Sequence, residues 1–180
     1  VYLVVAVPKN GGIVDRVMRF LDTGTELANP SILIDNIPAA RFHAGSRVAF
    51  GPDGKLYVST GDATDKNLAQ DKKSLAGKIL RINADGGIPN DNPFSGSPVW
   101  SYGHRNPQGL AWHPDNGFLY ESEHGPSGFD GPGGGDEVNL IEKGKNYGWP
   151  LVSHEEKRSG TEAPLIVFTP AEAPASLLVY

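Results

Sequence analysis

The sequence of 180 residues contains no cysteine, so disulfide bonds, thiolate metal sites and cysteine nucleophiles are excluded. It also lacks any uninterrupted apolar stretch near the roughly 18 residues that a membrane-spanning helix needs, and no membrane span is expected. Basic residues are in the minority, because 16 Lys and Arg face 21 Asp and Glu, which gives a net charge of −5. A phosphate-binding surface needs an excess of positive charge, so nucleic acid is not expected as a partner.

Glycine and proline are abundant instead, with 23 and 15 residues. This composition is typical of short strands joined by tight turns rather than of a helical protein. Only a weak helical period appears, near residues 68–75, and it predicts a very short helix at most. The first residue, Val1, lies inside the apolar run 1–7 with no Met or charged leader before it. We therefore expect residues 1–180 to be a single domain truncated at both ends, part of a longer protein.

Apolar and β-branched runs bounded by turn residues predict the strands. They lie at residues 1–7, 13–20, 31–37, 77–82 and 137–141, and in pairs within 48–59 and 110–120. Asn10-Gly11 is a strong hairpin signal between the first two strands. The two strand pairs are joined by Pro-Asp turns of similar design, which indicates repeated sheet units.

These repeats predict an all-β fold, a β-propeller built from four-stranded antiparallel blades. A blade repeat takes about 40–50 residues, so the chain holds roughly three to four blades. An incomplete ring exposes apolar blade faces. The chain alone is therefore expected either to be poorly stable or to self-associate through these faces.

The chemically unusual residues gather in 101–150. The motif Gly-His-Arg-Asn-Pro-Gln occupies 103–108, Glu-His-Gly-Pro occupies 123–126, and a glycine-rich loop leads to Asp136 and Glu137. Ordering such a glycine-rich loop costs much conformational entropy and usually needs a partner. Ca²⁺ binds about six to eight oxygens, including backbone carbonyls, and is the expected partner.

With these motifs in view, the chain resembles the soluble sugar dehydrogenases that use pyrroloquinoline quinone (PQQ), namely the glucose/sorbosone and aldose sugar dehydrogenases. The resemblance extends over nearly the whole sequence and is nearer to the aldose sugar dehydrogenases. It implies a six-bladed propeller, PQQ and Ca²⁺ as cofactors, and oxidation of aldoses at C1 to lactones. It also implies an aldose substrate, an external electron acceptor and a periplasmic or secreted location.

The same resemblance implies roles for individual residues. His43 matches the catalytic general base, and Arg105 matches a catalytic residue that also holds PQQ together with Asn106. The backbone carbonyls of Gly125 and Pro126 match the ligands of the Ca²⁺ that touches PQQ. Glu137 and the backbone of Tyr147 match positions around a second, structural Ca²⁺, and Asp136 lies beside them.

The sequence departs from the family pattern at several positions. Phe42 stands where some relatives have an acidic residue before the base, and His124 stands where some have Gln. The insert Phe129–Gly134 lengthens the metal loop relative to the glucose enzyme. The upstream and downstream segments that complete the PQQ pocket are not in this sequence, and residues 174–180 resemble the start of the next family motif, cut off within a strand.

Each proposed role suits the chemistry of its side chain. The reference pKa of imidazole, about 6.5, leaves His43 basic and largely neutral near pH 7. The planar guanidinium of Arg105 pairs with carboxylates, which PQQ carries. A Ca²⁺ on the Gly125 and Pro126 carbonyls would act as a Lewis acid toward the quinone.

Simpler interpretations exist for the same residues. His43 could be a hydrogen-bonded loop histidine, Arg105 a brace for its turn, and Asn106 a turn cap. Asp136 and Glu137 could be a solvated pair at the start of a strand. We expect His104 to be structural.

Two further groups are assigned to structure. The acidic segment with Asp62, Asp65 and Asn67 lacks the glycine and distal Glu of an EF-hand, and we interpret it as a solvated turn. The aromatic residues Tyr57, Trp112 and Trp149 are expected in the blade core rather than at a cofactor.

Two alternative functions remain open at this point. One is a non-catalytic propeller that keeps Ca²⁺ for structure and binds a ligand or a protein partner. The other is an inactive fragment of the enzyme, because part of the pocket lies outside this sequence.

Overall fold

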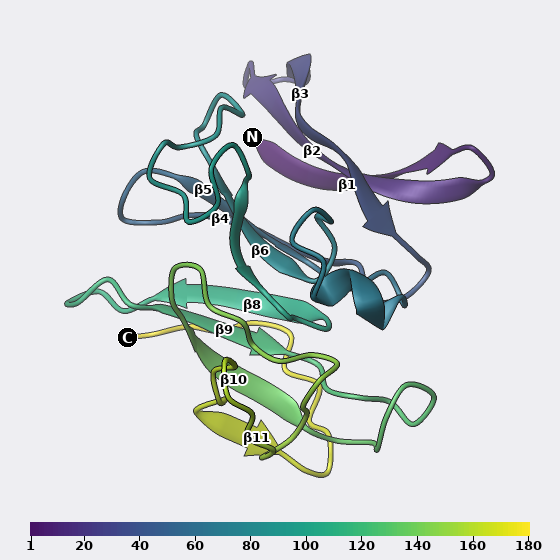
Figure 1. Cartoon of the computed structure of the whole chain (residues 1–180). Helices are drawn as coiled ribbons and strands as arrows, with labels where there is room; N and C mark the ends of the chain where they lie inside the picture. The colour runs from purple at the N-terminus through teal and green to yellow at the C-terminus, as the bar shows by residue number, and fades with distance from the viewer.

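The computed structural model describes residues 1–180 and consists of eleven strands and one short 3-10 helix. The strands form three antiparallel sheets, arranged one after another along the chain (Figure 1). The element bounds are β1 (Tyr2–Lys9), β2 (Gly12–Asp22), β3 (Leu27–Ala39), β4 (Gly45–Phe50), β5 (Leu56–Thr60), η1 (Lys66–Ala69), β6 (Lys78–Ile82), β7 (Val99–Tyr102), β8 (Pro107–Trp112), β9 (Leu119–Glu123), β10 (Asp136–Ile141) and β11 (Ile166–Phe168). None of the helical structure is long or apolar enough to cross a membrane.

The first sheet contains β1, β2 and β3 in that order. Asn10 and Gly11 join β1 to β2 with φ angles of 50° and 80°, and Lys9 pairs with Gly12 across this turn. Positive φ at both central residues defines the two-residue hairpin turn that Asn-Gly favours. The predicted hairpin is therefore confirmed.

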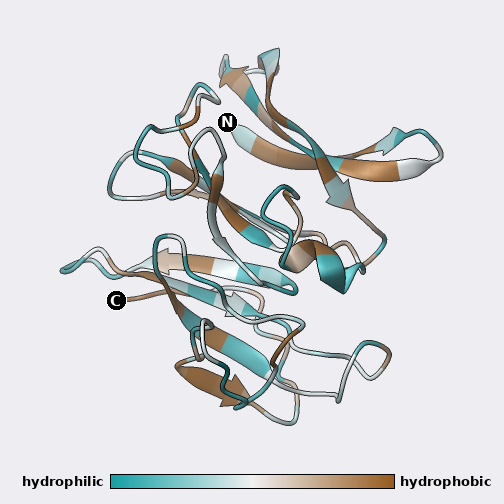
Figure 2. Ribbon diagram, viewed as in Figure 1, coloured by the Kyte–Doolittle hydropathy of each residue, from teal (hydrophilic) through white to brown (hydrophobic).

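The middle sheet, β4-β5-β6-β7, is buried on both faces. Leu56 and Val58 of β5 pack into one apolar cluster with residues of the first sheet. Tyr57, between them, packs into a second cluster with Leu110 and Leu119 of the third sheet. Because successive strand residues face opposite sides, one five-residue strand serves both inter-sheet cores. In Figure 2 the apolar residues lie mainly on the strands, and the long loops are mostly pale or polar.

The third sheet has the order β8-β9-β10-β11. Its first strand, β8, packs against β4, the first strand of the middle sheet. Side chains that immediately precede β4 and β8 are thus brought to neighbouring positions. Three successive sheets of three or four antiparallel strands are propeller blades, so the predicted all-β blade architecture is confirmed.

The structure corrects several details of the predicted elements. The short helix occupies Lys66–Ala69 rather than 68–75, and two short strands, β7 and β11, were not predicted. Residues 174–180, expected to begin a strand, contain no regular element. They run beside Gly109 of β8, and the Ala175 carbonyl accepts a hydrogen bond from Arg47 Nη2 of β4.

Candidate active site

His43 lies in the turn before β4, with a φ of 56° and 8% exposure. Its carbonyl comes so close to Gly61, just after β5, that any side chain at residue 61 would collide with it. Glycine at 61 is thus required for the close approach of the two segments. This packing fixes the backbone from which the imidazole projects.

Asp62 holds the imidazole of His43. Asp62 Oδ1 lies 2.7 Å from His43 Nδ1 and also accepts a hydrogen bond from the Thr64 N–H at 2.8 Å. Asp62 Oδ2 accepts a hydrogen bond from Trp149 Nε1 at 2.8 Å. A carboxylate beside Nδ1 places the imidazole proton there, which leaves the Nε2 lone pair available as a base.

These contacts overturn two interpretations made from sequence. Asp62 is 1% exposed and bonded to His43, so it is no solvated residue, although Asp65 and Asn67 of the same segment are exposed. Trp149 is buried, but it lines the site and lies under the Arg105 guanidinium, whose carbon is 5.5 Å from the ring centre. Tyr57, as expected, belongs to the apolar core.

Arg105 is nearly fully buried, with a side-chain exposure of 2%. Its Nε donates to Asp130 Oδ2 at 2.7 Å, and its Nη1 donates to the His124 carbonyl at 3.0 Å. Its Nη2 donates to Ser127 Oγ at 3.0 Å. The guanidinium is therefore rigidly held, and its remaining N–H groups are left for an anionic ligand.

Asn106 connects two blades. Its Oδ1 accepts hydrogen bonds from the Gly45 N–H at 3.2 Å and from Gln108 Nε2 at 2.9 Å. Gly45 follows His43 by two residues, so this contact ties the turn before β4 to the turn before β8. No protein acceptor pairs with Asn106 Nδ2, which remains a free donor in the cleft.

An open cleft of about 470 Å³ is formed where these turns meet. Its lining consists of Phe42, His43, Arg105, Asn106, His124, Ser127 and Phe129. Both blades thus contribute residues to it. The three side chains expected from the sequence to be catalytic or cofactor-binding therefore share one cavity.

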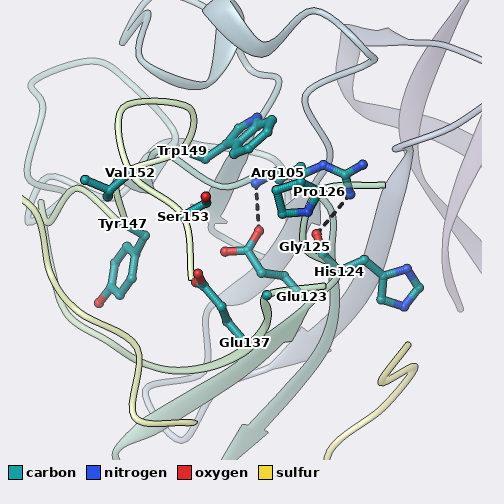
Figure 3. Close-up of a pocket in the computed structure, with 11 residues that line it drawn as sticks. Arg105, Glu123, His124, Gly125, Pro126, Glu137, Tyr147, Trp149, Val152 and Ser153 are labelled. Carbon is teal, nitrogen blue, oxygen red and sulfur yellow. Dashed lines mark hydrogen bonds between the residues drawn. The ribbon is translucent and has the colours of Figure 1, made fainter. Parts of the chain in front are cut away.

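A second cavity, of about 10 Å³, adjoins the first, and both have Arg105 and His124 in their walls. Gly125, Pro126, Glu137 and Tyr147 also line this small cavity. Figure 3 shows the carboxylates of Glu123 and Glu137 turned toward the same space. The volume is about that of one water-sized sphere, which suits a single ion.

Several residues that line this small cavity have backbone oxygens without a hydrogen-bond partner. No N–H group of the protein donates to the backbone carbonyls of Gly125, Pro126 or Tyr147. The Tyr147 hydroxyl is used elsewhere, because it donates to the Leu140 carbonyl at 2.5 Å. Unpaired carbonyls beside carboxylates are the ligand set that Ca²⁺ prefers.

Buried carboxylates crowd around Asn139 behind the cavity. Asn139 Nδ2 donates to Glu121, Glu123 and Glu137 at 3.0, 3.4 and 3.3 Å. Burial, and then the Glu123 charge, raises the pKa of Glu137 to about 8, and the same causes raise the pKa of Glu121 well above its usual range.

Unpaired oxygens mark the same region. Glu121 Oε1 and Asn139 Oδ1 are buried without any hydrogen-bond partner. A bound cation would offset the crowding of negative charge near Glu137, so the residues present fit Ca²⁺.

Asp136 has a structural role that the sequence did not reveal. It is 2% exposed, and its Oδ1 accepts a hydrogen bond from the Gly125 N–H at 2.8 Å. Its Oδ2 accepts hydrogen bonds from the N–H groups of Glu172 and Ala173 at 2.8 and 2.7 Å. Asp136 is therefore buried rather than solvated, and it fixes the Gly125 turn.

Several site residues were missed at the level of sequence. Asp62 and Glu121 come from two separate segments, and Phe129 and Asp130 are neighbours in the β9–β10 loop, but no local motif connects any of them to His43 or Arg105. No role was expected for Glu123 of the Glu-His-Gly-Pro motif, yet its Oε2 accepts a hydrogen bond from the backbone N–H of Arg105 at 2.7 Å. The expected structural residue His104 is fully buried between Ser101 and Glu123.

The fold is that of β-propeller blades, and two adjoining cavities lie beside the hydrogen-bonded His43–Asp62 pair and the Gly125–Pro126 turn. The sequence model of the Glucose / Sorbosone dehydrogenase family matches residues 1–180. The chain therefore belongs to this family, and the resemblance indicated by the motifs is confirmed.

Named relatives agree with this assignment. An aldose sugar dehydrogenase from Escherichia coli (strain K12) is 44% identical over 127 residues, which cover 68% of this chain and 33% of that protein. Quinoprotein glucose dehydrogenase B from Acinetobacter calcoaceticus is 40% identical over 156 residues, which cover 74% of this chain and 31% of that protein.

A solved structure agrees as well. The PQQ-bound form of aldose sugar dehydrogenase from Streptomyces coelicolor has a TM-score of 0.81 at 40% identity, and the match covers 95% of this chain and 50% of that one. The chain thus spans half or less of the length of these relatives.

Proposed function

We propose that the protein to which this chain belongs oxidises aldose sugars at C1 to lactones, with PQQ and Ca²⁺ as cofactors and an external acceptor for the electrons. The observation that carries this proposal is the placement of His43, Arg105 and Gly125 around two adjoining cavities that share a wall. The names of the relatives support the reaction class. A structural metal alone would require neither a buried base dyad nor a buried arginine facing a cleft.

His43 is the general base in this proposal. Its Nε2 takes the proton of the C1 hydroxyl while the C1–H leaves as a hydride, so C1 loses two electrons and becomes the lactone carbonyl. Asp62 stabilises the resulting imidazolium and keeps the Nε2 lone pair turned to the cleft. When bound, PQQ supplies the ortho-quinone that accepts the hydride.

Arg105 and Asn106 would hold the acidic cofactor. The guanidinium is fixed by Asp130, Ser127 and the His124 carbonyl, so it binds an anion without first losing side-chain freedom. Gly125 and Pro126 would hold one Ca²⁺ through their carbonyls, where it acts as a Lewis acid. Glu137 and the Tyr147 carbonyl, which the family resemblance assigns to a second Ca²⁺, line the same small cavity and would bind this one ion as well.

Reconstitution tests the proposal directly. The full-length protein is incubated with PQQ and Ca²⁺, and reduction of an artificial electron-accepting dye is followed with a panel of aldoses. We expect turnover that requires both cofactors, and a His43→Ala variant that loses kcat by about 10²- to 10⁴-fold with little change in PQQ affinity. Absence of turnover with every aldose would overturn the proposal, and equal losses of kcat and PQQ affinity in His43→Ala would overturn the role of the base.

The same family resemblance supports a periplasmic or secreted location for the protein. Fractionation of the source cells, with detection of the protein by antibody, would test it. Recovery only in the cytoplasmic fraction would contradict this part of the proposal.

A further inference from the structure

The loop between β9 and β10 is closed upon itself and clamped to the buried arginine. The Ser127 N–H donates to Asp130 Oδ1 at 3.0 Å, and the Gly128 N–H donates to the Gly131 carbonyl at 3.0 Å. Asp130 Oδ2 accepts the 2.7 Å hydrogen bond from Arg105 Nε. Residues 127–131 are therefore held in one arrangement at the edge of the cleft.

Phe129 lies at the tip of this clamped loop. Its ring centre is 5.7 Å from that of the His43 imidazole, and the two planes are inclined by only 26°. The side chain is nevertheless 66% exposed, and it lines the 470 Å³ cleft together with Phe42, which is 61% exposed. Neither ring belongs to an apolar core cluster.

Two exposed aromatic rings beside a base present a particular kind of surface. Each ring exposes apolar surface to water. A ligand with an apolar face would bind there favourably, because it would remove this surface from water. A cyclic aldose has such a face, made by its ring C–H groups. An open-chain aldehyde or polyol presents no continuous flat face.

We propose that Phe129 is the specificity-determining residue of this cleft, and that it stacks on the C–H face of a cyclic aldose whose C1 hydroxyl faces His43. The proposal rests on the proposed function and adds the substrate feature that the cleft selects. Asp130 is the positioning residue, because its bond to Arg105 fixes the loop that carries the ring. The protein then favours pyranose rings over short open-chain substrates.

Kinetics of matched variants test the proposal in the full-length protein loaded with PQQ and Ca²⁺. Phe129→Ala is expected to raise KM for cyclic aldoses about tenfold, equivalent to about 1.4 kcal/mol, with kcat changed much less. For a short open-chain hydroxyaldehyde, whose C1 hydrate supplies the hydroxyl proton and the hydride, KM is expected to stay the same. Phe129→Trp should restore the low KM, and Phe118→Ala, which removes a 52% exposed ring from the β8–β9 turn, is the matched control.

A binding measurement gives a second readout that does not depend on turnover. The aromatic protons of the protein are selectively saturated by NMR. The transfer of this saturation to the ring C–H protons of glucose is then measured with and without PQQ. We expect strong transfer in the wild type and in Phe118→Ala, and weak transfer in Phe129→Ala.

The outcomes separate this inference from the function on which it rests. No turnover with any aldose would overturn the proposed function. Turnover by the wild type with unchanged KM and unchanged saturation transfer in Phe129→Ala would overturn the role of Phe129 alone. A loss of kcat that is equal for cyclic and open-chain substrates would show that Phe129 only shields His43, which also overturns the proposal.

Discussion

The middle sheet and the β9–β10 region both contain buried side chains, but of different chemistry. In β5 and β6 the apolar residues alternate between two dry clusters, as Leu56 and Tyr57 illustrate. In β9 and β10 the corresponding interior positions hold Glu121, Glu123 and Asn139, with unpaired oxygens among them. Burial of apolar groups stabilises a sheet unaided, whereas buried carboxylates need an opposite charge or a proton. The first region therefore makes the scaffold, and the second makes a site.

The largest effect on stability is expected in the middle sheet. Leu80 is fully buried in the first apolar cluster, so Leu80→Ala should lower the free energy of unfolding by about 2–5 kcal/mol. Urea unfolding measures this loss, which should be the same with and without Ca²⁺. Leu3→Ala, at a site 38% exposed, is the control with a change within about 0.5 kcal/mol. A Ca²⁺-dependent loss in Leu80→Ala would show that the two regions are not independent.

Asp62→Asn should impair catalysis without much effect on stability. Asp62 accepts hydrogen bonds from His43, Thr64 and Trp149 at once, but an asparagine has one acceptor oxygen and one donor nitrogen. If the nitrogen faces His43, the imidazole proton moves to Nε2 and the base is lost, and we expect kcat to fall about a hundredfold.

A second variant checks this cause. Trp149→Phe removes the competing donor, so the double variant should recover part of the kcat lost in Asp62→Asn. Steady-state kinetics with one aldose measures both. Failure of the second substitution to restore any activity would contradict the tautomer explanation.

Removal of Ca²⁺ should affect only the carboxylate-rich region directly. A ligand present at 100 times its Kd stabilises the folded state by about 2.7 kcal/mol, so a chelator should lower stability by about this amount. Calorimetry with and without chelator measures the change. In Glu137→Gln the chelator effect should shrink, because one carboxylate near the cavity is lost. An undiminished effect would place the bound ion elsewhere.

The smallest effect, measured per pH unit, concerns Lys78, a buried charge of the middle sheet. Burial lowers its pKa to about 7, although its Nζ donates to the carbonyls of Leu68, Ala69 and Ala76. The folded pKa lies below the unfolded value of 10.5, so the unfolded chain binds more protons between these two pH values.

Lys78 should therefore make stability rise with pH in this window, by at most about 1.4 kcal/mol per pH unit. Urea unfolding at several pH values, at constant Ca²⁺, would show this slope in the wild type and a smaller slope in Lys78→Met. Equal slopes would mean that the three carbonyls keep the ammonium charged.

Much of the fold could be predicted because its signals are local. Asn10-Gly11 and the alternating residues of β5 specify a turn and a strand within a few residues. The short strands β7 and β11 were missed, since three or four residues give too little periodicity.

Some residues of the site could likewise be predicted from local motifs, and others could not. The motif residues His43, Arg105 and Gly125 stand out in sequence, and the structure brings them to adjoining cavities, while their roles stay predictions. Asp62 did not stand out, because an aspartate in a turn is ordinarily solvated and only the approach of Gly61 to His43 buries it. Phe129 did not stand out either, because its contact with His43 depends on the ion pair between Asp130 and Arg105. These two residues are 25 positions apart in the sequence.

The sequence by itself determined the all-β blade pattern, the family and the residue types available for chemistry, because these depend on short-range periodicity and motif order. Only the tertiary structure decided which carboxylate orients the base, which oxygens remain free for a cation and which ring borders the cleft. The physical reason is that hydrogen bonding and desolvation act through space. Residues far apart along the chain acquire a joint function only when the packing of neighbouring blades excludes water between them.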